Sequence, residues 1–306
     1  MDIFYKIISE ICQENEIKLD LLSFDWIYEL KKDGLVRHIV GRNFDLNKDA
    51  SAQIVSDKYA CYEVLHKNRV PVIDHLMLFN PLTRPENIEN SGSMEKAREY
   101  FFQNNQRVVV KPNNGFQGKN VFLCENQKEL EQAIQSIFLR ENSLSISPFA
   151  NIKYEYRAFV LKQKSLYVYR KEPAYLIGDG ITNVGELLKL KNISEDHLFK
   201  NIKLSYIPLK GEKYSVTWKH NLNNGATATQ VKSGELLFHI NELAQKAAKF
   251  VNIDFATVDI VLLNSGDLRV IEINSGVVAA KFLEQSPGQY ETIKSIYSAA
   301  ILKMFL

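Results

Sequence analysis

The spacing of apolar residues predicts helices at several places along the chain. Over 130–138 apolar side chains recur at i, i+3, i+4 and i+7, which is typical of an amphipathic helix. The same spacing recurs over 236–251 and, more weakly, over 59–67. The stretches 3–14 and 288–304 are also expected to be helical, so predicted helices lie near both ends of the sequence.

Short runs of β-branched and aromatic residues between polar turns predict strands. Two long polar stretches, 80–95 and 189–213, interrupt the pattern and are expected to be loops. Helices mixed with hairpin-connected strands predict an α+β fold, and a length of 306 residues favours two lobes. The predicted strands are 17–23, 107–111, 121–124, 144–149, 155–162, 165–171, 256–263 and 268–273.

Composition and charge argue against several classes of protein. The net charge is +2 without a long basic block, which argues against a dedicated nucleic-acid surface. No apolar run reaches the roughly 18–20 residues that a membrane span needs, and no secretory signal is visible. Cys12, Cys61 and Cys124 have neither metal-type nor redox-type spacing, and the six histidines show no paired spacing. We therefore expect a cytoplasmic protein with reduced cysteines and no zinc site.

The stretch 256–276 places two carboxylates on a predicted hairpin. With a two-residue turn at 265–266, Asp259 lies directly opposite Glu272, and Asn274 shares their face of the sheet. Opposed carboxylates repel, and their apolar neighbours suggest a partly buried site. A bound Mg²⁺ would remove this repulsion, because carboxylate and amide oxygens are suitable ligands for it. The alternative is a solvated hairpin with two unrelated acids.

A lysine and a glycine-containing loop form a second candidate feature. Lys111 ends a β-branched strand, and the loop 113–120 that follows contains Gly115 and Gly118. Glycines let backbone N–H groups approach phosphate oxygens, and a lysine adds a point charge. The loop is not a Walker A motif, because no GxxxxGK[ST] occurs. The alternative is an ordinary hairpin with a polar tip.

A third feature is the strand that carries Glu155 and Arg157 on one face. If residues 163–164 form the following turn, Arg157 falls opposite Arg170. Two neighbouring cations need an anion, and a phosphate or an acyl phosphate would serve. The alternative is a surface ion pair between Glu155 and Arg157, which would contribute little.

Taken in order, these features resemble the ATP-grasp superfamily. The resemblance covers roughly residues 50–300, and it is carried by Lys111 with its loop, by Glu155-Tyr156-Arg157, and by Asp259 with Glu272-x-Asn274. Two further stretches, 173–188 and 221–226, are similar to segments of the cyanophycin synthetase and bifunctional glutathione synthetase branch. Residues 56–58, followed by 70–72, resemble the start of the ATP-grasp region.

The resemblance implies a particular fold and reaction. It implies two α+β subdomains with antiparallel sheets that clamp ATP, at 56–145 and 146–306, after a short N-terminal segment, 1–55. It also implies an ADP-forming carboxylate–amine ligase. A substrate carboxylate would attack the γ-phosphate of ATP to give an acyl phosphate, and an amine would then displace phosphate.

Roles for individual residues also follow from the resemblance. The site is expected to use ATP and Mg²⁺, with Mn²⁺ as an alternative metal. Phosphate contacts would come from Lys58 and Lys111 with Gly115 and Gly118; the adenine hinge would contain Ser147, Phe149 and Ala150; and Glu155 would meet the ribose. The metal ligands would be Asp259, Glu272 and Asn274, and the residues near the reacting phosphate would be Arg157, Arg170, Lys171 and Asn221.

Some positions depart from the branch. Lys171 stands where the branch usually has arginine, and Asn223-Asn224-Gly225 replaces a serine followed by two glycines. These departures leave the substrates open; amino acids or short peptides are expected, with no nucleic-acid or membrane partner and a homodimer as the default oligomer. Two alternative functions stay open: an ATP-grasp kinase that phosphorylates a hydroxyl, and a non-catalytic nucleotide-binding regulator.

Overall fold

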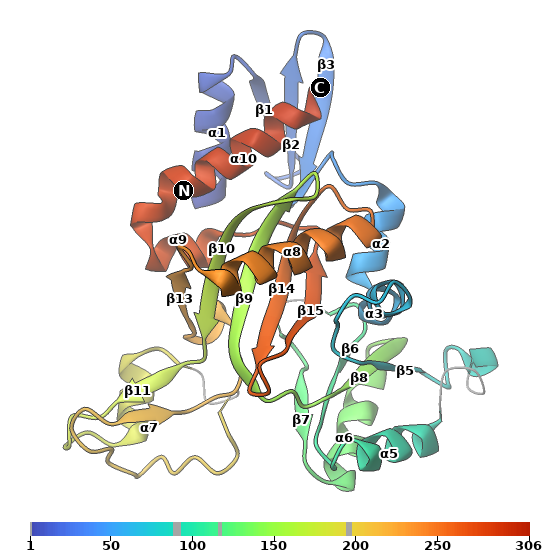
Figure 1. Cartoon of the computed structure of the whole chain (residues 1–306), viewed down its shortest axis with the longest axis vertical. Helices are drawn as coiled ribbons and strands as arrows, with labels where there is room; N and C mark the ends of the chain where they lie inside the picture. The colour runs from blue at the N-terminus through green and yellow to red at the C-terminus, as the bar shows by residue number, and fades with distance from the viewer. Residues whose placement is uncertain (1, 88–92, 116–117, 194–197) are drawn as a thin grey trace.

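The computed structural model describes residues 2–87, 93–115, 118–193 and 198–306. The centre of the molecule is a five-stranded antiparallel sheet with the order β13-β10-β9-β14-β15 (Figure 1). Every pair in this sheet is antiparallel. Its strands are β9 (Ile152–Leu161), β10 (Lys164–Glu172), β13 (Thr227–Gln230), β14 (Phe255–Leu263) and β15 (Leu268–Asn274).

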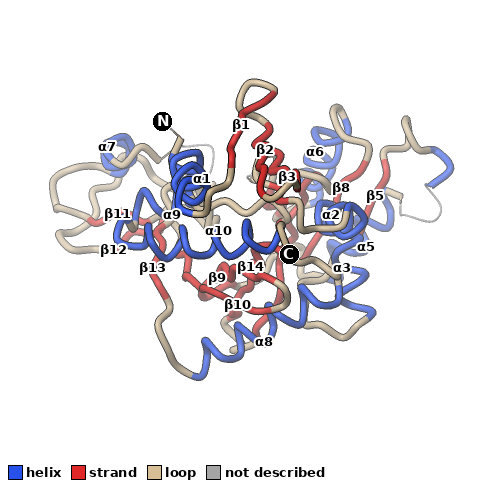
Figure 2. Tube along the Cα trace, turned by 90° about the horizontal axis from the view of Figure 1, so that it is seen from above, coloured by secondary structure: helices blue, strands red, loops and turns tan. Residues whose placement is uncertain are grey.

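Helices cover the two faces of the central sheet. Figure 2 shows the central strands between α8 (Glu235–Phe250) and α10 (Tyr290–Met304). On the α8 side, small and branched residues such as Ala158, Val258 and Ile260 are fully buried. This face also receives α2 (Asp49–Ser56) and α3 (Lys58–Lys67). On the other face, aromatic side chains pack toward α9 (Ala280–Gln285) and α10.

A second sheet has the order β5-β8-β6-β7. Its strands are β5 (Leu76–Phe79), β6 (Val108–Pro112), β7 (Phe122–Cys124) and β8 (Ser143–Pro148). One face packs on α5 (Met94–Gln103) and α6 (Gln127–Phe138) through Val108, Val110, Leu144 and Ile146. Because side chains alternate along a strand, Val109, Lys111, Ser145 and Ser147 lie on the opposite face, where the candidate site is found.

The N-terminal residues form more structure than the sequence predicted. After α1 (Ile3–Glu14), four strands make an antiparallel sheet with the order β1-β2-β3-β4. Phe4 and Phe44 lie within 5.3 and 5.8 Å of the Tyr297 ring of α10, so the helix near the C-terminus completes this layer. Only α1 and the first strand were predicted. The strands are β1 (Lys18–Leu22), β2 (Ile27–Lys32), β3 (Leu35–Val40) and β4 (Asn43–Phe44).

A small third unit follows β10. It contains β11 (Tyr175–Ile177), α7 (Val184–Leu190) and β12 (Lys213–Ser215), with its own small apolar core. Between α7 and β12 the described residues form neither helix nor strand, in agreement with the predicted loop. Lys200 and Lys219 donate hydrogen bonds to the main-chain carbonyls of Leu123 and Val121, at 3.3 and 3.2 Å. The third unit is thereby attached to the β7 edge of the second sheet.

The predicted register of the carboxylate hairpin is confirmed, although the predicted turn is wrong. Asp259 pairs with Glu272, as expected. The loop holds three residues, 264–266, because Leu263 pairs with Asp267 and accepts a hydrogen bond from Gly266. A bulge between the Asp259 and Ile260 positions then shifts the register by one residue. The longer turn and the bulge compensate, so the two acids still face each other.

The hairpin of β9 and β10 differs from prediction in its register. The turn is Lys162-Gln163, both with positive φ, rather than residues 163–164. A bulge near Ser165 reverses part of this shift, by one residue, so Tyr169 rather than Arg170 lies opposite Arg157. The predicted pairing of Arg157 with Arg170 is therefore wrong.

None of the helices in the described ranges combines the length and apolar character needed to cross a lipid bilayer.

Candidate functional site

A buried ionic cluster lies on the α10-side face of the central sheet, near its end. Arg157 on β9 donates two hydrogen bonds to Asp259 on β14, at 2.8 and 2.6 Å. Lys171 on β10 contacts the same carboxylate at 3.3 Å and also forms an ion pair with Glu155. The Asp259 and Lys171 side chains are only 4% and 6% exposed, so water contributes little to screening these charges.

The cluster balances its own charge, with two cations facing two carboxylates. Burial alone would raise the pKa of Asp259, but Arg157 and Lys171 outweigh this effect and lower it. Burial disfavours the charged form of Lys171, but Asp259 and Glu155 raise its pKa. The expectation that the cations need an external anion is thus wrong for the protein without ligand. The expected repulsion between Asp259 and Glu272 is also absent, because Asp259 is neutralised by cations.

Arg170 lies away from this cluster. It pairs with Tyr156, so its side chain projects from the α8 side of the sheet. There it donates a hydrogen bond to Glu172 and lies 4.5 Å from the centre of the Tyr154 ring. The structure brings Lys171, and not Arg170, next to Arg157.

Glu272 and Asn274 lie beside the cluster on the edge strand β15. The Glu272 side chain is 35% exposed, and its carboxylate is 3.9 Å from the Lys58 ammonium. Asn274 pairs with Thr257, whose buried hydroxyl has no hydrogen-bond partner in the described structure. These oxygens suit a hard cation such as Mg²⁺. Asp259 completes the predicted set, but its two oxygens are engaged by Arg157 and Lys171.

Within the described ranges, no three His, Cys, Asp or Glu side chains form a group that could hold a metal ion. The predicted ligand set contains two carboxylates, from Asp259 and Glu272, and the amide of Asn274. It has only two side chains of these four types, so the absence of a group of three does not contradict it. The donor set of Glu272, Asn274 and Thr257 therefore fits a magnesium ion that would take its remaining ligands from phosphate and water.

Lys111 and Lys58 lie together opposite the acidic edge of the central sheet. Lys111 is 9% exposed, and it forms no ion pair with any described residue. Burial, followed by the nearby charge of Lys58, lowers the pKa of Lys111 to about 8. Lys58 donates hydrogen bonds to the carbonyls of Asn113 and Gly115, at 3.3 and 2.7 Å. Two clustered lysines with one partly exposed carboxylate nearby make a site that favours an anionic ligand.

The glycine loop and Asn221 come together near these lysines. Gly118 has a φ of +71°, which glycine adopts without strain, and a Cβ at this position would lie 3.3 Å from the Asn221 amide nitrogen. Gly115 packs against Pro112. Residues 116–117 of the predicted loop lie outside the described ranges. Asn221, in the segment after β12, therefore lies beside the loop at Gly118.

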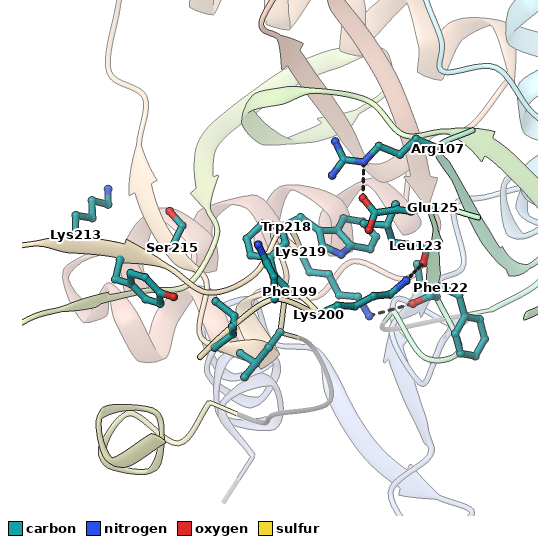
Figure 3. A pocket seen from close by; sticks show the side chains of 15 residues that line it. Arg107, Phe122, Leu123, Glu125, Phe199, Lys200, Lys213, Ser215, Trp218 and Lys219 are labelled. Atoms are coloured by element: carbon teal, nitrogen blue, oxygen red, sulfur yellow. Dashed lines mark hydrogen bonds and ion pairs between the residues drawn. The ribbon is translucent and has the colours of Figure 1, made fainter. Parts of the chain in front are cut away.

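A cavity of about 790 Å³ opens beside the predicted hinge (Figure 3). Arg107 and Trp218 line it, and both pack on Phe149, at 4.1 and 5.7 Å from its ring centre. Ser147 is buried and Ala150 is partly exposed on the same segment. Leu123 and Lys219 also line the cavity. The residues of the ionic cluster, Glu155, Arg157, Lys171 and Asp259, do not line this cavity.

The sequence did not point to two histidines at this site. His75 is buried, donates from Nδ1 to the carbonyl of Ile73 at 2.9 Å, and leaves Nε2 without a partner among the described residues. Burial, followed by the charge of Lys111, lowers its pKa well below the usual value. His220 is also buried, with Nδ1 3.6 Å from Glu155 and Nε2 unpartnered. Paired spacing could not reveal them, because the two histidines are far apart in the sequence; the position of His220 directly before Asn221 was the only signal.

Comparison with protein families identifies part of this architecture. The family model of the ATP-grasp domain matches residues 55–176, which include the lysines, the loop, the hinge and β9. Among solved structures, a D-alanine–D-alanine ligase from Bacillus anthracis superposes with a TM-score of 0.56 at 14% identity, over 84% of this chain and 71% of that one. A bifunctional glutathione synthetase from Pasteurella multocida gives 0.53 at 20% identity, over 90% of this chain and 39% of that one. The ATP-grasp fold and the α+β class are therefore confirmed.

Curated relatives fall in the branch that the sequence motifs predicted. A bifunctional glutathione biosynthesis protein from Clostridium perfringens is 24% identical over 256 residues, which cover 76% of this chain and 31% of the relative. A cyanophycin synthetase from a Nostoc species is 25% identical over 251 residues, which cover 73% of this chain and 26% of the relative. The chain thus spans about a third or less of the length of these relatives.

Proposed function

We propose that this ATP-grasp chain is an ATP-dependent ligase that joins a carboxylate to an amine through an acyl phosphate. One observation carries the proposal: Lys111, a buried lysine without an ion pair in the described structure, lies with Lys58 opposite the Glu272 and Asn274 oxygens. A triphosphate would supply an anion for the two lysines, and the divalent cation bound to it would supply a positive charge for the Glu272 and Asn274 oxygens.

The nucleotide would lie along the face of the second sheet that carries Lys111. Its phosphates would contact Lys111 and Lys58, and the glycines of the loop would allow close approach of the backbone. Its base would lie by the hinge, next to the cavity beside Phe149 and Trp218, where aromatic and aliphatic surface is available.

A magnesium ion would be held by Glu272 and Asn274, with Asp259 as the third ligand. When bound, it would neutralise charge on the phosphate oxygens. Asp259 could join it only if Arg157 and Lys171 shift toward another anion. A γ-phosphate or an acyl phosphate is such an anion, so we propose that these two cations exchange Asp259 for the reacting phosphate. Phosphoryl transfer mainly requires positioning and charge neutralisation of this kind.

The substrates we propose are amino acids or short peptides. The relatives named above are a glutathione biosynthesis protein and a cyanophycin synthetase, and the structural neighbours are named as a ligase and a synthetase. These names support amide formation over phosphorylation of a hydroxyl. The departures at Lys171 and at 223–225 lie next to the reacting groups, so the particular acid and amine of this chain need not be those of any relative.

A phosphate-release screen tests this function. Purified protein would be incubated with Mg·ATP and pairs of amino acids or dipeptides, and phosphate and ADP would be measured with each component omitted in turn. A ligase releases phosphate only when both an acid and an amine are present. Formation of ADP without free phosphate, with a phosphorylated alcohol as the product, would show a kinase; binding of ATP without turnover across a broad screen would show a regulator.

A further inference from the structure

His220 is a buried histidine of the site, and one of its two ring nitrogens has no partner among the described residues. It lies between β12 and the short turn that starts at Asn221, and its side chain is 4% exposed. Nδ1 faces the Glu155 carboxylate at 3.6 Å, while Nε2 is buried and has no partner in the described part of the chain. A buried nitrogen of this kind costs free energy unless a water molecule or a ligand forms a hydrogen bond with it.

The surroundings fix the form of the ring. The Glu155 carboxylate lies 3.6 Å from Nδ1, and its charge favours the neutral form of the ring with the proton on Nδ1 and the lone pair on Nε2. Burial is the largest influence on the pKa of His220 and lowers it; Lys171 lowers it further, whereas Glu155, Glu172 and the Trp218 carbonyl raise it, with a net decrease. The ring is therefore neutral at physiological pH and able to accept a proton.

Both Glu155 oxygens are already engaged by protein groups. Oε1 pairs with Lys171 and Oε2 faces His220. A carboxylate that orients an imidazole, with the second ring nitrogen free, is the arrangement that activates a nucleophile in many enzymes. This arrangement differs from the ribose contact that the sequence resemblance implied for Glu155.

We propose that Glu155 and His220 form an acid–base pair in which His220 Nε2 deprotonates the amine substrate. The proposal rests on the proposed ligase function. An amine reaches the site as an ammonium ion, which has no lone pair for attack. His220 takes one proton from it. The neutral amine then forms the C–N bond with the acyl phosphate, the bond from carbon to the phosphate oxygen breaks, and phosphate leaves with that electron pair and takes up the second proton. His220 returns its own proton to water.

Hydroxylamine separates this role from the rest of the reaction. It is largely unprotonated at neutral pH, so it attacks an acyl phosphate without needing a base, whereas an ordinary amine substrate needs one. The His220→Gln and His220→Asn variants should therefore lose at least about tenfold, and up to the 10²–10⁴-fold typical of a base, in amide formation. They should keep hydroxamate formation. The KM for ATP should stay within about twofold, because Glu155, the carboxylate that His220 faces, does not bind ribose in this account.

The controls separate the possible failures. His38→Gln, at a partly exposed histidine of the N-terminal sheet, should change neither rate. Equal loss of amide and hydroxamate, or no loss of amide, would overturn the acid–base role of His220. No hydroxamate from the wild-type protein would instead overturn the ligase function itself. If the variants do not fold, the pH profile of the wild-type protein decides. The rate of amide formation should stay constant as the pH falls to below 6.5, the ordinary pKa of histidine, and a decline that begins above pH 6.5 contradicts the proposal.

Discussion

Replacing Lys111 with methionine should stabilise the protein without nucleotide and weaken the binding of Mg·ATP. Methionine keeps an unbranched apolar side chain of similar length but removes the charge. Burial lowers the pKa of Lys111 from 10.5 to about 8. At about 1.4 kcal/mol per pKa unit, this change corresponds to ~3 kcal/mol by which the charged lysine disfavours the folded state near pH 7.

The pH dependence has a definite sign. Between pH 8 and 10.5 the unfolded chain keeps the Lys111 proton more tightly than the folded chain, so the free energy of unfolding of the wild type should rise across this window. The Lys111→Met variant should lack this rise. Its advantage should be about 3 kcal/mol at pH 7 and should decline toward zero as the pH approaches 10.5.

Urea unfolding at pH 7, 8, 9 and 10, with and without Mg·ATP, measures both effects. Loss of one charged hydrogen bond to phosphate, at about 1.5–3 kcal/mol, should weaken binding by roughly 10- to 100-fold. Lys164→Met, at an exposed lysine, should change neither quantity. A Lys111→Met variant that is less stable at pH 7, or that binds Mg·ATP like the wild type, would refute the assignment of Lys111 to an anion site.

Two further changes test other parts of the structure. Glu272→Gln removes the carboxylate that lies 3.9 Å from Lys58, and thermal-shift titration should show at least a tenfold weaker response to Mg·ATP because an amide is a poorer ligand for Mg²⁺. Glu284→Gln, at an exposed surface ion pair, is the control. If the Glu272→Gln variant responds to Mg·ATP like the wild type, the metal must bind elsewhere. Gly178→Ala would put a Cβ 2.2 Å from the Leu209 carbonyl oxygen, so it should cost about 1–3 kcal/mol and hasten proteolysis within 175–215. Gly288→Ala, which meets no atom within 4 Å, should cleave at the wild-type rate, and equal cleavage of both variants would contradict the close packing at Gly178.

The sequence predicted those features that depend on local pattern. The amphipathic spacing predicted α6 and α8, a helix was expected where α10 lies, and the strand-like runs predicted β6, β14 and β15. It missed the N-terminal strands β2 to β4, where charged residues such as Glu29 and Lys31 alternate with the buried ones and no long apolar run appears. Such a sheet becomes stable only by packing on α1 and α10, a contact between the two ends of the sequence.

Register was the weakest prediction, because each bulge changes which side chains share a face. Between Asp259 and Glu272 the register shifts of a longer turn and of a bulge cancelled, so the predicted pairing was correct. Next to Arg157 the shifts of the turn and of the bulge did not cancel, so Lys171 rather than Arg170 lies on the same face as Arg157. The neutralisation of Asp259 by Arg157 and Lys171 could not be predicted from either hairpin alone, because it joins three strands. His220 was missed for the same reason, because Glu155, the carboxylate that it faces, is distant in sequence.

Trapping an activated carboxylate tests the central claim most directly. The protein would be incubated with Mg·ATP, a pool of amino acids and dipeptides, and hydroxylamine, and hydroxamate, ADP and phosphate would be quantified together. The account predicts that ADP and phosphate form in equal amounts, that each equals the hydroxamate plus any amide formed, that all products require ATP and the acid, and that Glu272→Gln reduces them together. Consumption of ATP with a stable phosphorylated alcohol and no hydroxamate would contradict it.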